Sequence, residues 1–286
     1  MQKRKFILWI LVIVIIVAGV LICRRPDIRF IIKNTWSRLE EESDFREISI
    51  DEKNKDLQSI SIGSVKDNQA DIIYNNSLAL VNKDYPISED IVSNIVNYKE
   101  TDIKMDESVV DVFGELSEAV KKQVGENLYI RDSYRSKEEQ ESLHIRDKNK
   151  AAIPGSSEHE MGLALDVYIE FFAGDGFIKS DAGQFVNENC WRYGFIVRYP
   201  LFKKRITGIK FEPWHIRYVG LPHSEIIYKK GLTLEEYIQS LEIGKFYSSG
   251  EYIISRQKGE EILFLDDLKE VVISPDNMGN YIITGK

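Results

Sequence analysis

The chain has 286 residues, 43% of them hydrophobic, which is enough for one large domain with appendages or for two small domains. Its formal net charge is −8 and no basic cluster stands out, so the composition argues against a nucleic-acid partner. The only cysteines, Cys23 at the end of an apolar run and Cys190, are not expected to pair, which excludes a disulfide framework.

The N-terminal residues predict a membrane anchor. Residues 6–23 carry no charge, and as a helix they would cover roughly 27 Å, close to the thickness of the hydrocarbon layer. The basic residues within the tip, 1–5, predict that it stays in the cytoplasm. A cleaved signal peptide is the alternative, but the apolar run is long and no small-residue cleavage site ends it. We therefore expect a single-pass membrane protein whose main domain is extracellular.

Residues 24–75 are mostly charged and polar, with a short amphipathic helix expected near residues 30–39. We interpret this segment as a juxtamembrane stalk that is partly disordered. The alternative is that part of it packs on the domain that follows.

Residues 76–243 contain segments with the 3.6-residue apolar period of helices and segments with the two-residue period of strands, so they predict an α+β domain. Helical spacing of apolar residues predicts helices over 107–124, 181–193 and 234–241, and a helix that begins at 137. Strands are predicted at 127–131, 163–168 and 194–199. Residues 244–286 change character to short strand-like runs split by Gly and Asp, which indicates a small β appendage.

Two separated motifs bring together residue types that bind metals. His159 and Asp166 flank Gly162, where a turn passes into a strand, so both side chains can point at one ion. About fifty residues later, His215 follows Glu212 by three positions. Two His and one Asp suit a catalytic zinc site, which uses three protein ligands and leaves one position for water.

The remaining carboxylate of these motifs, Glu212, is the predicted general base. The alternative is a surface salt bridge between Glu212 and Arg217. Glu158 and Glu160 flank a predicted ligand, and we expect them either to face solvent or to support the ligand from behind. Arg135, at a predicted strand end, suits a carboxylate or a developing oxyanion, the alternative being an arginine that only stabilises the fold.

The same motifs resemble the VanY-type D-alanyl-D-alanine carboxypeptidases, zinc peptidoglycan metallopeptidases in the group that includes lysostaphin-like and Hedgehog-like folds. The resemblance spans roughly residues 76–240. It rests on Ser-x-His-x-x-Gly-x-Ala-x-Asp at 157–166, on Glu-Pro-Trp-His-x-Arg-Tyr-Val-Gly at 212–220, on Tyr134-Arg135-Ser136 with Gln140, and on residues 80–86. Asp132-Ser133 departs from the Ser-Gly that precedes Tyr-Arg in many members.

The resemblance implies an antiparallel sheet flanked by helices, with zinc on its open face, and hydrolysis of the C-terminal D-alanine from peptidoglycan stem peptides. It also implies that Ser157 and Gln140 face the terminal carboxylate of the substrate; capping or loop hydrogen bonds are their alternative. A D,D-dipeptidase, an L,D-carboxypeptidase and a non-catalytic wall-binding module on the same fold remain open, as does the choice between a role in glycopeptide resistance and ordinary wall maturation.

Overall fold

The computed structural model of the protein describes residues 25–40, 42–50, 57–67, 72–148 and 151–286, together with Trp9 and Gly19. Apart from those two residues, the predicted tip and anchor, 1–23, lie outside the described part. Within that part, no helix combines the length and the apolar character that crossing a bilayer requires. This finding contradicts the predicted single-pass location, which rested on the uncharged run 6–23 and the basic residues before it.

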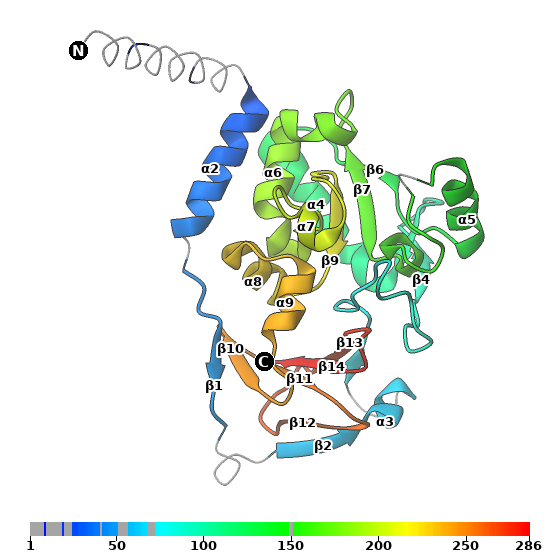
Figure 1. Ribbon diagram of the computed structural model, residues 1–286, viewed down its shortest axis with the longest axis vertical. Helices are drawn as coiled ribbons and strands as arrows, with labels where there is room; N and C mark the ends of the chain where they lie inside the picture. The colour runs from blue at the N-terminus through cyan, green and yellow to red at the C-terminus, as the bar shows by residue number, and fades with distance from the viewer. Residues whose placement is uncertain are drawn as a thin grey trace.

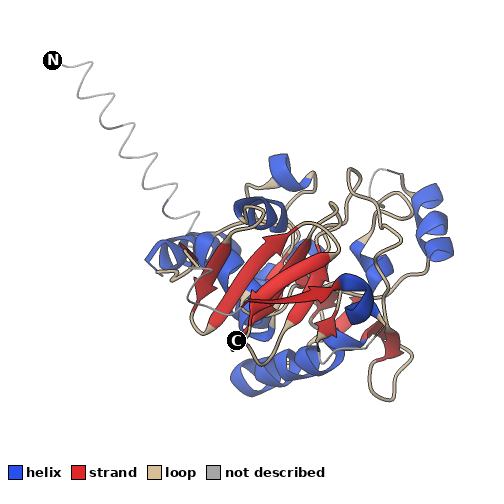
Figure 2. Cartoon of the chain, turned by 90° about the horizontal axis from the view of Figure 1, so that it is seen from below, coloured by secondary structure: helices blue, strands red, loops and turns tan. Residues whose placement is uncertain are grey.

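The centre of the molecule is a four-stranded antiparallel sheet in the order β6-β7-β9-β8. Its strands are β6 (Tyr129–Asp132), β7 (Ala164–Tyr168), β8 (Phe195–Val197) and β9 (His215–Tyr218). Figure 2 shows strands in the middle of the molecule with helices around them. The predicted mixture of sheets and helices is confirmed, and each strand predicted between 127 and 199 forms.

Helix α4 (Glu107–Val124) supplies much of the core beside this sheet. Val109, Phe113, Leu116 and Val120 recur every three or four residues and are buried, so one face of the helix is apolar. The Asp106 side chain accepts from the Ser108 N–H at the start of the helix, and Gly125 ends it in the left-handed conformation. Local signals alone therefore define this helix.

The other helices surround the sheet (Figure 1). The predicted helix over 181–193 divides into α6 (Asp181–Asn189) and the 3-10 turn η3 (Cys190–Tyr193). The remaining helices and turns are α5 (Lys137–Arg146), η1 (Glu158–Met161), η2 (Gly174–Lys179), α7 (Lys204–Thr207), α8 (His223–Lys230) and α9 (Leu234–Ser240). A hairpin of β4 (Ile95–Asn97) and β5 (Lys104–Asp106) precedes α4.

The C-terminal strands form a module with segments from the N-terminal part of the chain. A six-stranded sheet has the order β1-β10-β11-β14-β13-β3, and β12 pairs with β2 in a separate ribbon. The strands are β1 (Arg46–Ile48), β2 (Leu57–Ser61), β3 (Ile73–Tyr74), β10 (Phe246–Ser249), β11 (Tyr252–Gln257), β12 (Glu261–Leu265), β13 (Val272–Pro275) and β14 (Tyr281–Gly285). Figure 1 shows β1 and β2 beside the C-terminal strands.

The described residues of 24–75 thus differ from the predicted stalk. Besides β1–β3 they form α2 (Pro26–Glu40) and α3 (Ile62–Lys66), and the Tyr228 hydroxyl on α8 donates to Asn34 of α2. The physical reason is that short polar-looking strands gain their apolar contacts from partners about two hundred residues away.

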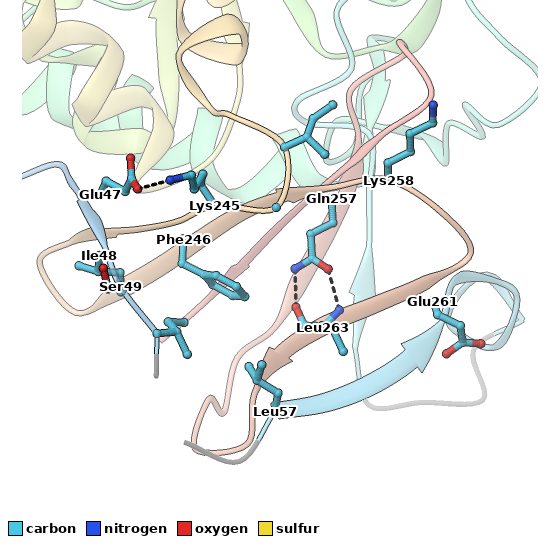
Figure 3. A pocket seen from close by; sticks show the side chains of 13 residues that line it. Glu47, Ile48, Ser49, Leu57, Lys245, Phe246, Gln257, Lys258, Glu261 and Leu263 are labelled. Carbon is cyan, nitrogen blue, oxygen red and sulfur yellow. Dashed lines mark hydrogen bonds and ion pairs between the residues drawn. The ribbon is translucent and has the colours of Figure 1, made fainter. Parts of the chain in front are cut away.

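A cavity of about 480 Å³ lies in this module, between β1, β10 and the β2–β12 ribbon (Figure 3). Gln257 reaches across it and exchanges two hydrogen bonds with the backbone of Leu263. None of the residues that line it belongs to the predicted site.

Candidate metal centre

The three predicted ligands converge on one point of the central sheet. One atom each from His159, Asp166 and His215 lie within 4.8 Å of one another. Asp166 on β7 and His215 on β9 are direct cross-strand partners, and His159 enters from η1, the turn before β7. The two imidazole rings meet edge to face, with centroids 5.1 Å apart. The arrangement follows from strand pairing, since partner side chains on one sheet face lie close together.

Gly162 sets the path of the chain from η1 into β7. It adopts φ +69°, and its N–H donates to the carbonyl of His159. A β-carbon at this position would lie 2.6 Å from the backbone nitrogen of Asp106, so no other residue fits without displacement. The glycine therefore fixes the separation between the first two ligands.

Hydrogen bonds define which nitrogen of His159 is free. The Nδ1 of His159 lies 2.7 Å from the carbonyl oxygen of Ser133, and a carbonyl can only accept, so Nδ1 carries the hydrogen. The lone pair of Nε2 then faces the cluster, 3.7 Å from Asp166 Oδ1. Burial lowers the pKa of His159 to about 3, which keeps the ring in the neutral form that binds metals.

Whereas His159 directs Nε2 toward the other predicted ligands, His215 directs Nδ1 toward them. Its Nδ1–H donates to Asp166 Oδ1 at 2.8 Å, and its Nε2 points the opposite way. Burial acts to lower the pKa of His215, but the hydrogen bond to Asp166 and the nearby negative charges of Asp166 and Glu158 outweigh it and raise this pKa to about 9. A metal at this site would take the place of the Nδ1 proton. Two imidazole nitrogens and a carboxylate oxygen are a donor set that fits Zn²⁺.

Glu212 begins the turn that leads into β9. Its N–H donates to the carbonyl of Tyr199, and its own carbonyl accepts from the N–H of His215. Burial, together with the negative charge of Asp166, raises the pKa of Glu212 above its usual range, although the charge of His215 opposes this. Arg217 is completely buried and donates to the carbonyls of Ser77 and Ala79, so it does not supply the alternative salt bridge.

Arg135 lies at the end of β6, close enough to His159 and Asp166 for its charge to lower the pKa of both. Its Nη1 donates to the side-chain oxygen of Gln140, and its Nε lies 3.3 Å from Asp132. The amide nitrogen of Gln140 donates to the carbonyl of Ala152, so both polar groups of this side chain are engaged within the protein.

Ser157 is buried at the start of η1, where its N–H donates to Glu160. Its role in binding substrate stays a prediction.

Comparison with known proteins shows the family of the chain. The VanY family model, D-alanyl-D-alanine carboxypeptidase, matches residues 102–221. A D-alanyl-D-alanine carboxypeptidase of Enterococcus faecium is 39% identical over 194 residues, which cover 62% of this chain and 62% of that protein. The bifunctional D-Ala-D-Ala dipeptidase and carboxypeptidase VanXYC of Enterococcus gallinarum is 35% identical over 57% of this chain and 93% of its own length. The chain belongs to the VanY family. The resemblance drawn from the motifs is thereby confirmed.

Solved structures extend the likeness beyond the matched motifs. The D,D-dipeptidase VanXYg, in complex with a D-Ala-D-Ala phosphinate analogue, superposes with a TM-score of 0.65 at 26% identity, over 80% of this chain and 98% of that one. VanYB in complex with D-alanine-D-alanine gives a TM-score of 0.51 at 30% identity, over 58% of this chain and 99% of that one. The LdcB LD-carboxypeptidase gives 0.50 at 34% identity, over 58% and 87%.

A buried group of charges lies behind His215 in this VanY-family chain; for Glu158 the sequence left open a solvent-facing or a supporting role, and it did not predict Arg198 and Glu235 as neighbours. Glu158 does not face solvent: its side chain is 1% exposed and pairs with Arg198 at 2.7 Å. Arg198 also forms two hydrogen bonds with Glu235 on α9. One signal was present in the sequence, because Arg198 is the only charged residue in the otherwise apolar strand segment 194–199.

Proposed function

We propose that the protein is a zinc-dependent D,D-carboxypeptidase that removes the C-terminal D-alanine from peptidoglycan stem peptides. The observation that supports this most strongly is the convergence of His159, Asp166 and His215. These three residues would hold the ion through Nε2, Oδ1 and Nδ1 respectively. When bound, zinc supplies Lewis-acid polarisation of the scissile carbonyl and lowers the pKa of water.

In this proposal Glu212 moves the proton. Its carboxylate accepts a proton from the attacking water and later delivers it to the nitrogen of the leaving D-alanine, so the amide C–N bond breaks as water adds across it. The raised pKa of Glu212 suits the first step, because a more basic carboxylate accepts the proton of the attacking water more readily.

Arg135 is the proposed partner for negative charge on the substrate, either the developing oxyanion or the terminal carboxylate. The hydrogen bond from Arg135 to Gln140 supports a positioning role for Gln140, and Ser157 remains a proposed contact of the terminal carboxylate. We assign the chemistry to a catalytic domain over residues 76–243, with residues 244–286 as an appendage.

A second candidate is a D,D-dipeptidase. The likeness to VanXYg, which covers 98% of that solved chain, favours it. The argument against a dipeptidase came from the sequence, since a membrane anchor was predicted and free dipeptide is mainly cytoplasmic.

Mass spectrometry of products separates these candidates. The zinc-loaded protein is incubated with pentapeptide and tetrapeptide stems and with D-Ala-D-Ala, with and without chelator. We expect chelator-sensitive loss of one D-alanine from the pentapeptide. Cleavage of the dipeptide alone would select the dipeptidase, and cleavage of the tetrapeptide alone the L,D-carboxypeptidase. Failure to cleave any of them would support a non-catalytic wall-binding module.

A further inference from the structure

A cluster of buried charges lies directly behind the candidate metal centre. Arg198 on β8 donates from Nε to Glu158 Oε1 at 2.7 Å, and from both terminal nitrogens to Glu235 on α9 at 2.9 and 2.7 Å. The side chains of Arg198 and Glu158 are each 1% exposed, and that of Glu235 is 8% exposed. The cluster therefore joins η1, the turn that carries His159, to β8 and α9.

Stability alone is a weak reason for such a cluster. Taking charges out of water costs several kcal/mol per ion, and apolar side chains of similar volume often serve the fold equally well. A buried ion cluster beside a reactive centre is better explained by the orientation that it imposes.

Two atoms at the edge of the cluster indicate that His215 is the side chain that the cluster orients. Glu158 Oε2 and His215 Nε2 are both buried, and neither has a hydrogen-bond partner among the residues that the structure describes. They lie 3.7 Å apart. A shift of less than about 1 Å would bring them to ordinary hydrogen-bond length.

We infer that Glu158, held in place by Arg198 and Glu235, is a positioning residue that keeps the hydrogen of His215 on Nε2, so that Nδ1 is free for a metal ion. An ionised carboxylate can only accept hydrogen bonds, and its Oε1 is already engaged by Arg198. The remaining oxygen therefore favours the Nε2–H form of His215. This inference rests on the metal centre of the proposed function and extends it to residues that do not touch the ion.

The variant Glu158→Gln tests the inference because it replaces the hydrogen-bond acceptor that faces His215 with a donor. Arg198 still requires an acceptor, so the amide oxygen faces Arg198 and the amide nitrogen faces His215. Nε2 must then accept, and the ring hydrogen moves to Nδ1, the atom that the metal needs. We expect Zn²⁺ affinity, measured by competition with a chromophoric chelator, to fall roughly 10- to 100-fold.

Asp276→Asn is the matched control. Asp276 is also fully buried and pairs with a guanidinium, that of Arg256 at 2.6 Å, but it lies in the C-terminal β module. Both variants are expected to unfold at lower denaturant concentration, whereas only Glu158→Gln is expected to lose Zn²⁺ affinity. An affinity within about threefold of wild type in Glu158→Gln, or an equal loss in both variants, would overturn the inference.

Nitrogen NMR of the histidine side chains in the full wild-type chain gives a second reading that does not depend on the variant folding. In the Zn²⁺-loaded protein we expect a protonated Nε2 and a metal-bound Nδ1 for His215; the opposite assignment would overturn the inference. Neither measurement uses peptide hydrolysis. A chain that binds Zn²⁺ as described but cleaves no stem peptide would refute the proposed function and leave the role of Glu158 standing.

Discussion

Replacing Gly162 with alanine adds only one carbon, but it should lower the free energy of unfolding substantially. Two separate costs apply at this position. The left-handed conformation at φ +69° costs an alanine roughly 1–2 kcal/mol. The added carbon would also lie 2.6 Å from Asp106 N and 2.7 Å from Ile95 Cδ1. Asp106 N cannot move away freely, because it donates to the carbonyl of Gly162 at 3.0 Å and Asp106 is the N-cap residue of α4.

Overpacking of this kind typically adds 1–3 kcal/mol, so Gly162→Ala should lower the free energy of unfolding by roughly 2–5 kcal/mol in total. Gly125→Ala is the control, since Gly125 has φ +85° but no atom within 4 Å of the added carbon. It should show only the conformational cost of roughly 1–2 kcal/mol.

Equilibrium denaturant unfolding of the wild type and both variants measures these values. Because Gly162 lies between His159 and Asp166, the Gly162→Ala variant should also bind Zn²⁺ more weakly than Gly125→Ala. Equal losses of stability in the two variants would refute the reasoning, because they would mean that the close contact with Asp106 has no energetic consequence.

Three further predictions concern catalysis and pH. Glu212→Gln should retain Zn²⁺ but lose roughly 10²- to 10⁴-fold in kcat on a D-Ala-D-Ala-ended peptide, and a near wild-type rate would remove Glu212 from the role of base. Since burial raises the pKa of Glu212, the wild-type kcat/KM should fall with decreasing pH at a point above the usual value of 4.5; a profile flat down to that value would contradict this. His223 is buried with a pKa lowered to about 3 from 6.5, so the unfolded chain takes up a proton in that window while the folded chain does not. Stability should therefore fall as pH drops from 6.5 toward 3, by up to about 1.4 kcal/mol per pH unit, and denaturant midpoints of His223→Gln at pH 7.5 and 5 should lack this part of the loss.

The central domain was largely predictable from sequence because its signals are local. The apolar spacing of residues 107–124, with Asp106 before it and Gly125 after it, defines α4 without knowledge of the rest of the chain. The alternation after Gly162 places Asp166 on one face of a strand, and the cross-strand position of His215 then brings the ligands together.

The N-terminal half of the β module was not predictable in this way. β3 has two residues and β1 has three. β2 pairs with β12, which lies far along the sequence: Ser59 of β2 donates to Glu261 of β12, 202 positions away. Short polar strands carry no periodicity of their own, so only their distant partners reveal them.

The burial of Glu158 was hidden for a related reason. A glutamate in a turn is compatible with a solvent-facing or a supporting role, and the neutralising partner of Glu158, Arg198, is forty positions away. Long-range charge pairing leaves little trace in local pattern, except for the single arginine inside an apolar strand.

Zinc-edge X-ray absorption, combined with the anomalous scattering of a crystal of the loaded protein, would locate the ion directly. We predict one zinc per chain, bound by the imidazoles of His159 and His215 and the carboxylate of Asp166, with metal–ligand distances of about 2.0–2.2 Å. An anomalous peak elsewhere in the chain, or a protein that keeps full zinc content after Asp166→Ala, would contradict the shared metal centre.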